Sequence, residues 1–175
     1  ILAVVPLGQS EGDWPTYRED NSRSASTSTR LANPYVQGRG ARVPQWAFSA
    51  ERSYVPTPPI CAGELVFVGG SDGIMRAIDA QTGRLSWQFS TAGPIKAAPT
   101  VWESRLFFGA GDGNVYVLEA GTGRLLWKFR AAPKDRLIMV YGNLCSTWPV
   151  NTGVLVQDGT AYFAAGIVDH DGTYV

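Results

Sequence analysis

Six polar and aromatic side chains in the C-terminal part of the chain could take part in binding. They are Arg136, Asn143, Trp148, Asp169, His170 and Asp171. A guanidinium, an amide and an indole beside carboxylates are typical of a mixed polar and aromatic site for a peptide or a small anion. The Asp-His-Asp turn could in addition hold a metal ion. The competing interpretation is that this turn is solvated and that Arg136 pairs with Asp135 or with a backbone carbonyl.

No set of catalytic residues accompanies these side chains. His170 is the single histidine, and the serines near Ser22 and Ser146 stand in no nucleophile-elbow pattern. The glycine-rich stretch 109–114 lacks the lysine of a phosphate-binding loop and opens a strand rather than a helix. The sequence therefore predicts no catalytic residue.

The elements that position these side chains belong to an internal repeat. Residues 64–89 and 104–129 align at an offset of 40 residues, and 11 of the 26 paired positions are identical. Shared positions include an Asp-Gly turn, a Thr-Gly turn and a tryptophan near the end of each copy. A 40-residue period with several short apolar runs is typical of a propeller blade.

Each copy divides into four expected strands. Three of them are Leu65–Val68, Met75–Ile78 and Leu85–Phe89 in the first copy, separated by turns at Asp72-Gly73 and Thr82-Gly83. Proline-flanked segments then supply a fourth strand per unit: Val55–Ile60, Ile95–Val101 and Trp148–Val156. The sequence predicts an all-β chain, a partial β-propeller of about three four-stranded blades, rather than a β-sandwich. The first and last units are expected to be incomplete, with Val43–Phe48 as an outer strand of a preceding blade.

The same blade geometry gathers the candidate binding residues on one face. The Asp-Gly turn of each copy and the link into the next blade are expected to lie at the same end of a blade. This face is predicted to hold the Asp72 and Asp112 turns, a long insertion with Arg136, Asn143 and Trp148, and the acidic turn. The insertion arises because Phe129 to Pro149 spans 20 residues, whereas Phe89 to Pro99 spans 10.

The repeat resembles that of pyrroloquinoline-quinone-type (PQQ-type) quinoprotein propellers, whose blades carry the motif Ala-x-Asp-x-x-x-Gly-x-x-x-Trp. The first copy has it as Ala77, Asp79, Gly83 and Trp87, and the second as Val117, Glu119, Gly123 and Trp127. The resemblance implies that each tryptophan lies between blades and that each acidic side chain ties down its turn. Docking tryptophans of this kind are structural, since one indole buries up to about 250 Å².

The resemblance also bears on activity. Working quinoprotein dehydrogenases hold PQQ with a calcium ion beneath a disulfide between adjacent cysteines. Here the two cysteines, Cys61 and Cys145, stand 84 residues apart, either as free thiols or as one long-range disulfide. We therefore expect no cofactor and a non-catalytic module that binds or scaffolds a protein, a peptide or a small polar ligand. The alternative is a fragment of a PQQ-dependent alcohol or sugar dehydrogenase.

Net charge and hydropathy limit the partners and the location that the sequence predicts. Fifteen basic and fifteen acidic side chains cancel, which makes nucleic acid an unlikely partner, and no apolar run reaches the length of a membrane helix. Residues 1–42 are interpreted as an export and lead-in segment that contains the motif DWPTYRED, and residues 43–175 as the propeller repeats. We expect an exported protein of the periplasm or cell envelope. Closure of a ring of four to eight blades would need further blades or a second copy.

Overall fold

A computed structural model describes residues 3–8, 13–26, 54–140, 142–167 and 171–175. Its regular elements within these ranges are the following twelve strands: β1 (Ile60–Ala62), β2 (Leu65–Val68), β3 (Ile74–Asp79), β4 (Leu85–Ser90), β5 (Thr100–Trp102), β6 (Arg105–Gly109), β7 (Asn114–Glu119), β8 (Leu125–Arg130), β9 (Leu137–Val140), β10 (Asn143–Ser146), β11 (Leu155–Gln157) and β12 (Thr160–Tyr162). None of the described residues forms a helix long and apolar enough to span a bilayer.

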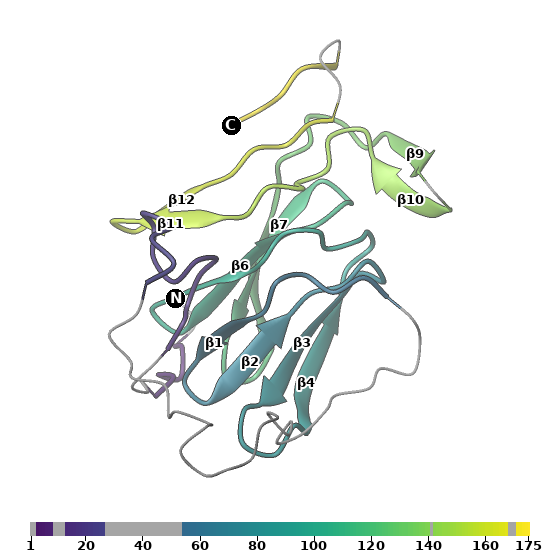
Figure 1. The fold of residues 1–175 in the computed structure, drawn as a ribbon. Coiled ribbons are helices and arrows are strands. Elements are labelled where there is room, and N and C mark those ends of the chain that lie inside the picture. Colours follow the sequence, from purple (N-terminus) through teal and green to yellow (C-terminus); the bar gives the residue numbers. More distant parts are fainter. Residues whose placement is uncertain (1–2, 9–12, 27–53, 141, 168–170) are drawn as a thin grey trace.

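Two four-stranded antiparallel sheets stand side by side (Figure 1). Their strand orders are β1-β2-β3-β4 and β5-β6-β7-β8, so that each sheet is a meander of consecutive strands. The registers repeat as well, because Phe67 pairs with Ala77 in the first sheet and Phe107 with Val117 in the second. These sheets confirm the predicted all-β class and the four-stranded unit.

The described residues include part of a third unit. Strands β11 and β12 pair with each other, and an isolated bridge joins Ala165 to Tyr174. The inserted segment forms a hairpin of its own, β9–β10, which projects from the sheets in Figure 1. The first described unit is complete, and the expected strand Val43–Phe48 lies outside the described residues.

The fourth strand of each unit differs from the prediction. It is shorter than predicted and lies at or just after the C-terminal end of each proline-flanked segment. It pairs with the strand that follows it, and it therefore begins a unit instead of ending one. Proline explains the shortening, because a residue without a backbone N–H cannot donate to a ladder. Pro58 and Pro59 precede β1, and Pro99 precedes β5.

Two apolar clusters join the units. One lies between the first two sheets and contains Phe67, Met75 and Ile95 from the first unit with Leu106 and Phe108 from the second. The other cluster joins the second sheet to the third unit and includes Val115, Val150 and Val156. All six residues of β7 are buried because that strand is covered on both faces. Coverage on both faces is what the continuous apolar runs of the sequence indicated.

Trp87 bridges the first two sheets. Its indole Nε1 donates to the carbonyl oxygen of Ala120 at 3.0 Å. The ring lies so close to Gly123 that a Cβ there would meet it at 2.6 Å. Trp127 differs from Trp87, because this side chain is 43% exposed in β8, and its expected packing between blades stays a prediction. In the register of the repeat, the counterpart of Gly123 would come after Val175, and Trp127 has no such turn to contact among the described residues.

The acidic residues of the two motif copies hold their turns. Asp79 Oδ1 accepts hydrogen bonds from the amide and hydroxyl of Thr82 at 2.7 Å each. Glu119 accepts from the Thr122 hydroxyl and from the Arg124 guanidinium. Both turns are therefore fixed by side-chain acceptors at the same position of the repeat.

The lead-in segment crosses the free edges of all three units. Trp14 and Cys61 of β1 exchange backbone hydrogen bonds of 2.7 and 2.9 Å. The Pro15 carbonyl accepts from Val101 of β5, and the Asn21 side chain donates to Val156 O of β11 at 2.8 Å. We call the edge that these first strands form the inner edge of the array. The lead-in therefore covers the inner edge of the array.

Candidate functional site

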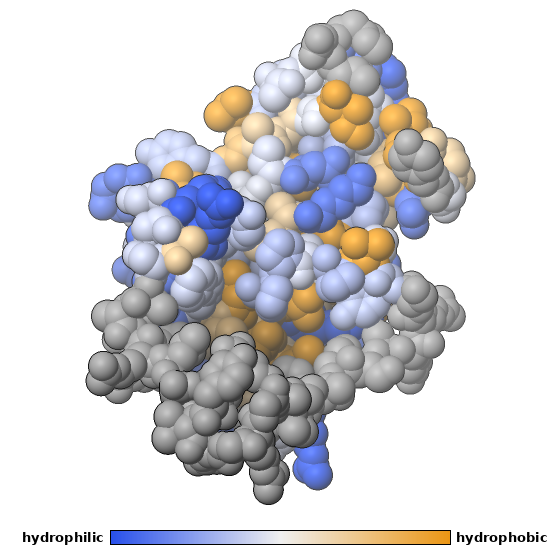
Figure 2. Space-filling model, in the orientation of Figure 1, coloured by the Kyte–Doolittle hydropathy of each residue, from blue (hydrophilic) through white to orange (hydrophobic). Residues whose placement is uncertain are grey.

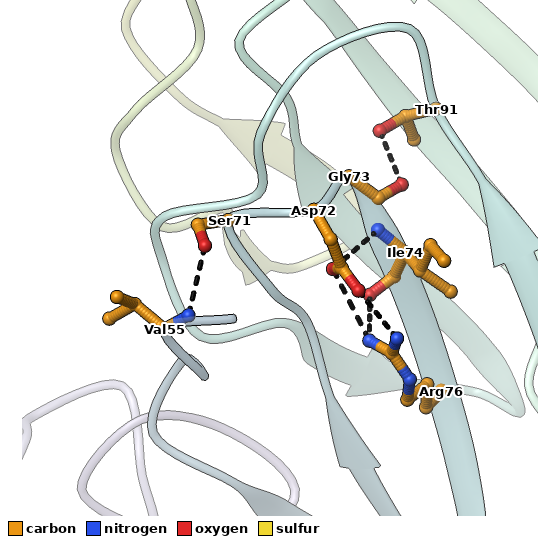
Figure 3. A network of polar contacts seen from close by, with 7 residues as sticks. All are labelled: Val55, Ser71, Asp72, Gly73, Ile74, Arg76 and Thr91. Atoms are coloured by element: carbon orange, nitrogen blue, oxygen red, sulfur yellow. Dashed lines mark hydrogen bonds and ion pairs between the residues drawn. The ribbon is translucent and has the colours of Figure 1, made fainter. Parts of the chain in front are cut away.

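The candidate face begins at the turn between β2 and β3, drawn in Figure 3. Arg76 Nη2 donates to Asp72 Oδ2 at 2.5 Å, and the Ile74 amide donates to Asp72 Oδ1 at 3.2 Å. The Thr91 hydroxyl, from the link into the next sheet, donates to the Gly73 carbonyl at 2.9 Å. The turn and the link therefore lie at the same end of the sheet, as the blade geometry requires.

The hydrogen bonds that Asp72 accepts also favour the ionised form of its carboxyl group. Burial alone would raise its pKa, but the hydrogen bonds from Arg76 and from the Ile74 amide outweigh it and leave the pKa below its usual value. The Arg76 side chain is only 6% exposed, and its guanidinium carbon lies 4.3 Å from the centre of the Tyr54 ring. A buried guanidinium needs such partners, and Asp72 is the anion that it has.

The Asp112 turn uses a different donor at the same position. Four residues after Asp112, the Tyr116 hydroxyl donates to Asp112 Oδ2 at 2.5 Å. Burial and this carboxylate raise the pKa of Tyr116, so the phenol remains a donor. In both sheets the turn aspartate is thus a structural acceptor whose partner is the residue four positions later.

The third copy of the turn departs from this rule. The residue four positions after Asp171 is Val175, which has no donor in its side chain. Instead, Arg136 reaches across from the insertion, with Nη2 at 3.3 Å from Asp171 Oδ2. Of the two partners proposed from the sequence, Asp135 pairs instead with Arg130 at 2.8 Å, and within the described ranges Arg136 donates to no backbone carbonyl.

Trp148 is a structural residue and not part of an open binding face. The side chain is 5% exposed and belongs to the apolar cluster between the second and third units. Its Nε1 donates to the Asp171 carbonyl at 2.8 Å, and the Arg136 guanidinium carbon lies 5.8 Å from its ring centre. The sequence prediction that Trp148 offers an indole to a ligand was wrong, because the inserted hairpin folds this ring inward.

The hairpin β9–β10 has two unlike faces. Met139 pairs directly with Leu144, and Leu137 lies two residues before Met139 on the same face. These three side chains are 69%, 49% and 52% exposed, respectively. Cys145, on the opposite face, is buried. Figure 2 shows hydrophobic side chains on the part of the surface where Figure 1 places this hairpin.

The hairpin also meets the first sheet. Asn143 and Leu144 line a small cavity of about 100 Å³ together with Ser71, Asp72 and the link 91–94. The hairpin further contacts the second sheet, because the Ser146 amide donates to the Gly111 carbonyl at 2.7 Å. The structure thus brings Asn143 to Asp72, Ser146 to the Asp112 turn, and Arg136 to Asp171 on one side of the array.

Part of the predicted site is not described. Asp169 and His170 lie outside the described residues, and a role of the acidic turn in metal binding stays a prediction. Within the described ranges, no three His, Cys, Asp or Glu side chains are grouped closely enough to hold a metal ion. Cys61 and Cys145 are free thiols, which settles the alternative that the sequence left open. Burial raises the pKa of both.

The hairpin itself was missed by the sequence analysis. The signal was present, since the apolar run 137–140 and the run 143–146 flank a glycine at position 142. Gly142 has a φ of 79°, as tight hairpin turns require. The alternation of Leu137 and Met139 with less exposed residues is the pattern that indicates a strand here.

Repeated four-stranded sheets and their shared apolar clusters define a partial β-propeller. A family model described as "Outer membrane protein assembly factor BamB" matches residues 36–164, which is 129 of the 175 residues. The chain belongs to this family of PQQ-like propeller repeats.

Curated relatives match the chain over short lengths. A quinoprotein alcohol dehydrogenase, PedE, of Pseudomonas putida is 46% identical over 41 residues, and a quinoprotein ethanol dehydrogenase of Pseudomonas aeruginosa is 45% identical over 42 residues. These stretches cover 23% and 24% of this chain and 6% and 7% of the two enzymes. The shared length is about one blade.

Solved structures show the same fold over most of the chain. The quinohemoprotein alcohol dehydrogenase from Comamonas testosteroni matches with a TM-score of 0.71 at 18% identity, over 91% of this chain and 24% of the enzyme. BamB from Moraxella catarrhalis matches with a TM-score of 0.53 at 21% identity, over 70% of this chain and 33% of that protein. At sequence identities this low, the structural matches show a common fold and nothing more.

Proposed function

We propose that this chain is part of an exported, non-catalytic PQQ-like propeller that binds a protein partner through the hairpin β9–β10. The observation that carries the proposal is the exposed apolar face of Leu137, Met139 and Leu144. Among the described residues these side chains are only partly covered, and Met139 is the most exposed of the three. Exposed apolar groups on a rigid scaffold are typical of protein-binding surfaces.

The anchoring of the hairpin supports this reading. Arg136 and Trp148 bind Asp171, and Ser146 binds the Asp112 turn, so the inner face of the hairpin is held to the array. A surface that is already ordered loses less conformational entropy on binding a partner. The family match to an outer membrane assembly factor is consistent with a protein partner and with the cell envelope.

The second candidate is a part of a PQQ-dependent dehydrogenase, and the curated relatives favour it. Two features of the described residues support a role without PQQ and calcium. The pocket beneath the lead-in has a volume of about 250 Å³, is lined by Lys96 and Arg23, and has no carboxylate in its lining to hold a calcium ion. Cys61 and Cys145 lie on separate elements and form no disulfide. We therefore propose that this chain works without the quinone.

A peptide display experiment tests the binding role. A library of random 12-residue peptides would be selected on the 175-residue chain and then assayed on the double variant Met139→Ser, Leu144→Ser. We expect peptides rich in apolar residues whose binding the double variant abolishes. Tyr162→Ser is the matched control, since Tyr162 is 51% exposed on a different strand pair and its loss should leave binding unchanged.

A spectroscopic titration tests the rival role. PQQ and calcium would be titrated into the same chain, followed by an assay of ethanol oxidation with an artificial electron acceptor. Saturable micromolar binding with turnover would refute the non-catalytic proposal. Failure to select any hairpin-dependent peptide would refute the protein-binding proposal.

A further inference from the structure

The inner edge of the array contains a pocket that is separate from the hairpin. It has a volume of about 250 Å³ and opens between the lead-in segment and the links that precede β5 and β11. Tyr17 and Arg23 line it from the lead-in, and Lys96 and Gly153 line it from the two links. It lies outside the site of the proposed function, and the inference below goes beyond that function.

The floor of this pocket is fixed by a short chain of hydrogen bonds. The hydroxyls of Thr16 and Thr100 lie 2.9 Å apart, and the Thr100 hydroxyl donates to the Val154 carbonyl at 2.6 Å. Both threonines are buried. Because the Pro15 carbonyl also accepts from Val101, the lead-in is held at this position by two independent contacts. The pocket is therefore preformed, and its charged side chains are presented by a rigid frame.

The lining combines two cations with apolar walls. Lys96 and Arg23 are both exposed, and within the described ranges neither forms an ion pair with a carboxylate. The Arg23 guanidinium carbon lies 5.4 Å from the centre of the Tyr17 ring, which orients it beside the opening. Pro58 and Ala98 supply apolar surface. Two cations without an ion-pair partner among the described residues, beside apolar walls, favour an anion with a small apolar body.

We propose that this pocket binds a small organic carboxylate, with its anionic end between Lys96 and Arg23 and its apolar body against Pro58 and Ala98. Its volume holds roughly 10 non-hydrogen atoms at the packing density of protein interiors. That size corresponds to benzoate and excludes a fused three-ring quinone from the interior of the pocket. Carboxylate recognition suits a lysine and an arginine, since both donate charged hydrogen bonds.

Benzoate is the probe for this site. Amide chemical shifts of the 175-residue chain would be followed by NMR during titration with benzoate and, in parallel, with benzyl alcohol, which has a similar body without the charge. We expect saturable benzoate binding with a dissociation constant on the order of 1 mM. Shifts should concentrate near Lys96, Ala97 and Gly153. Benzyl alcohol should bind at least about tenfold more weakly.

Substitution of the two cationic residues tests how much their charge contributes to benzoate binding. Lys96→Met and Arg23→Gln should each weaken benzoate binding about tenfold. Lys134→Met removes an exposed lysine from the insertion and should leave binding unchanged. Both pocket residues are exposed, and unchanged circular dichroism spectra would confirm that the variants fold.

Three results would overturn the proposal: shifts that do not saturate, equal binding of benzyl alcohol, or an equal loss in Lys134→Met. None of them bears on the hairpin or on PQQ, so this inference and the proposed function fail independently.

Discussion

The two tryptophans of the repeat provide a matched test of how the units hold together. Trp87 and Trp127 occupy the same position in successive copies, in β4 and β8. Among the described residues, Trp87 alone of the two contacts a turn of the next unit, with its Nε1 bonded to Ala120 O and its ring against Gly123. Trp127 is 43% exposed and touches Phe107 edge-on at a centroid distance of 6.3 Å. Their replacement by alanine should therefore have unequal costs.

The magnitudes follow from burial. Trp→Ala in a packed site costs about 3 to 5 kcal/mol, and loss of the indole hydrogen bond contributes about 1 kcal/mol of such a cost. We expect Trp87→Ala to lower the free energy of unfolding by about 4 kcal/mol. Trp127→Ala should lower it by about 1.5 kcal/mol, since much of this ring is already solvated. With a urea slope of about 2 kcal/mol/M, the midpoints would fall by about 2 M and 0.7 M.

Urea unfolding followed by far-UV circular dichroism measures both midpoints without relying on tryptophan fluorescence. Trp87→Phe covers the case in which Trp87→Ala does not fold. It keeps most of the apolar ring and removes the donor to Ala120, so we expect a cost of about 1 kcal/mol. Equal destabilisation by Trp87→Ala and Trp127→Ala would refute the reasoning, because it would mean that the contact with the next unit contributes nothing.

Two further substitutions test neighbouring features. Gly123→Ala should destabilise the chain more than Gly142→Ala, because both glycines have φ above 70° but only a Cβ at Gly123 meets the Trp87 ring; equal midpoints in urea would contradict the contact. Glu119 should make stability fall in acid, since the hydrogen bonds from Arg124, Thr122 and the Val5 amide lower its pKa to about 2. Its contribution is present above pH about 4.5 and is lost as the pH falls towards 2, so the midpoint gap between wild type and Glu119→Gln should shrink in that window; a gap that does not change with pH would contradict this.

The repeated strands were predictable because two copies of the same pattern constrain each other. Apolar runs and the Asp-Gly turns at a 40-residue offset located β2, β3 and β4 and their counterparts within one residue at either end. The first strands were placed less well, since proline-rich segments carry apolar residues but few donors for a ladder. The sequence pattern predicts these apolar segments correctly, but it overestimates how many of their residues pair with the next strand.

The insertion was harder to predict because the chain contains no second copy of it. Its aromatic residue Trp148 was read as a ligand contact, although the ring packs inward and bonds Asp171. The exposure of Trp127 was equally hidden, since it depends on a turn in a neighbouring unit and not on its own motif. Residues distant in the sequence determine whether Trp148 and Trp127 are buried or exposed, and the local sequence around each tryptophan does not identify those residues.

One rule connects the three Asp-Gly turns with the proposed function. Each turn aspartate needs a donor, which is Arg76 for the first turn and Tyr116 for the second. In the third turn the donor is Arg136, which comes from the insertion. The inner side of the insertion thus replaces a contact that the other units make within a single sheet. The structural contacts of the insertion with Asp171 thus lie on its inner side, whereas Met139 on the outer face of β9–β10 is 69% exposed. The outer face is therefore the part that we propose a partner binds.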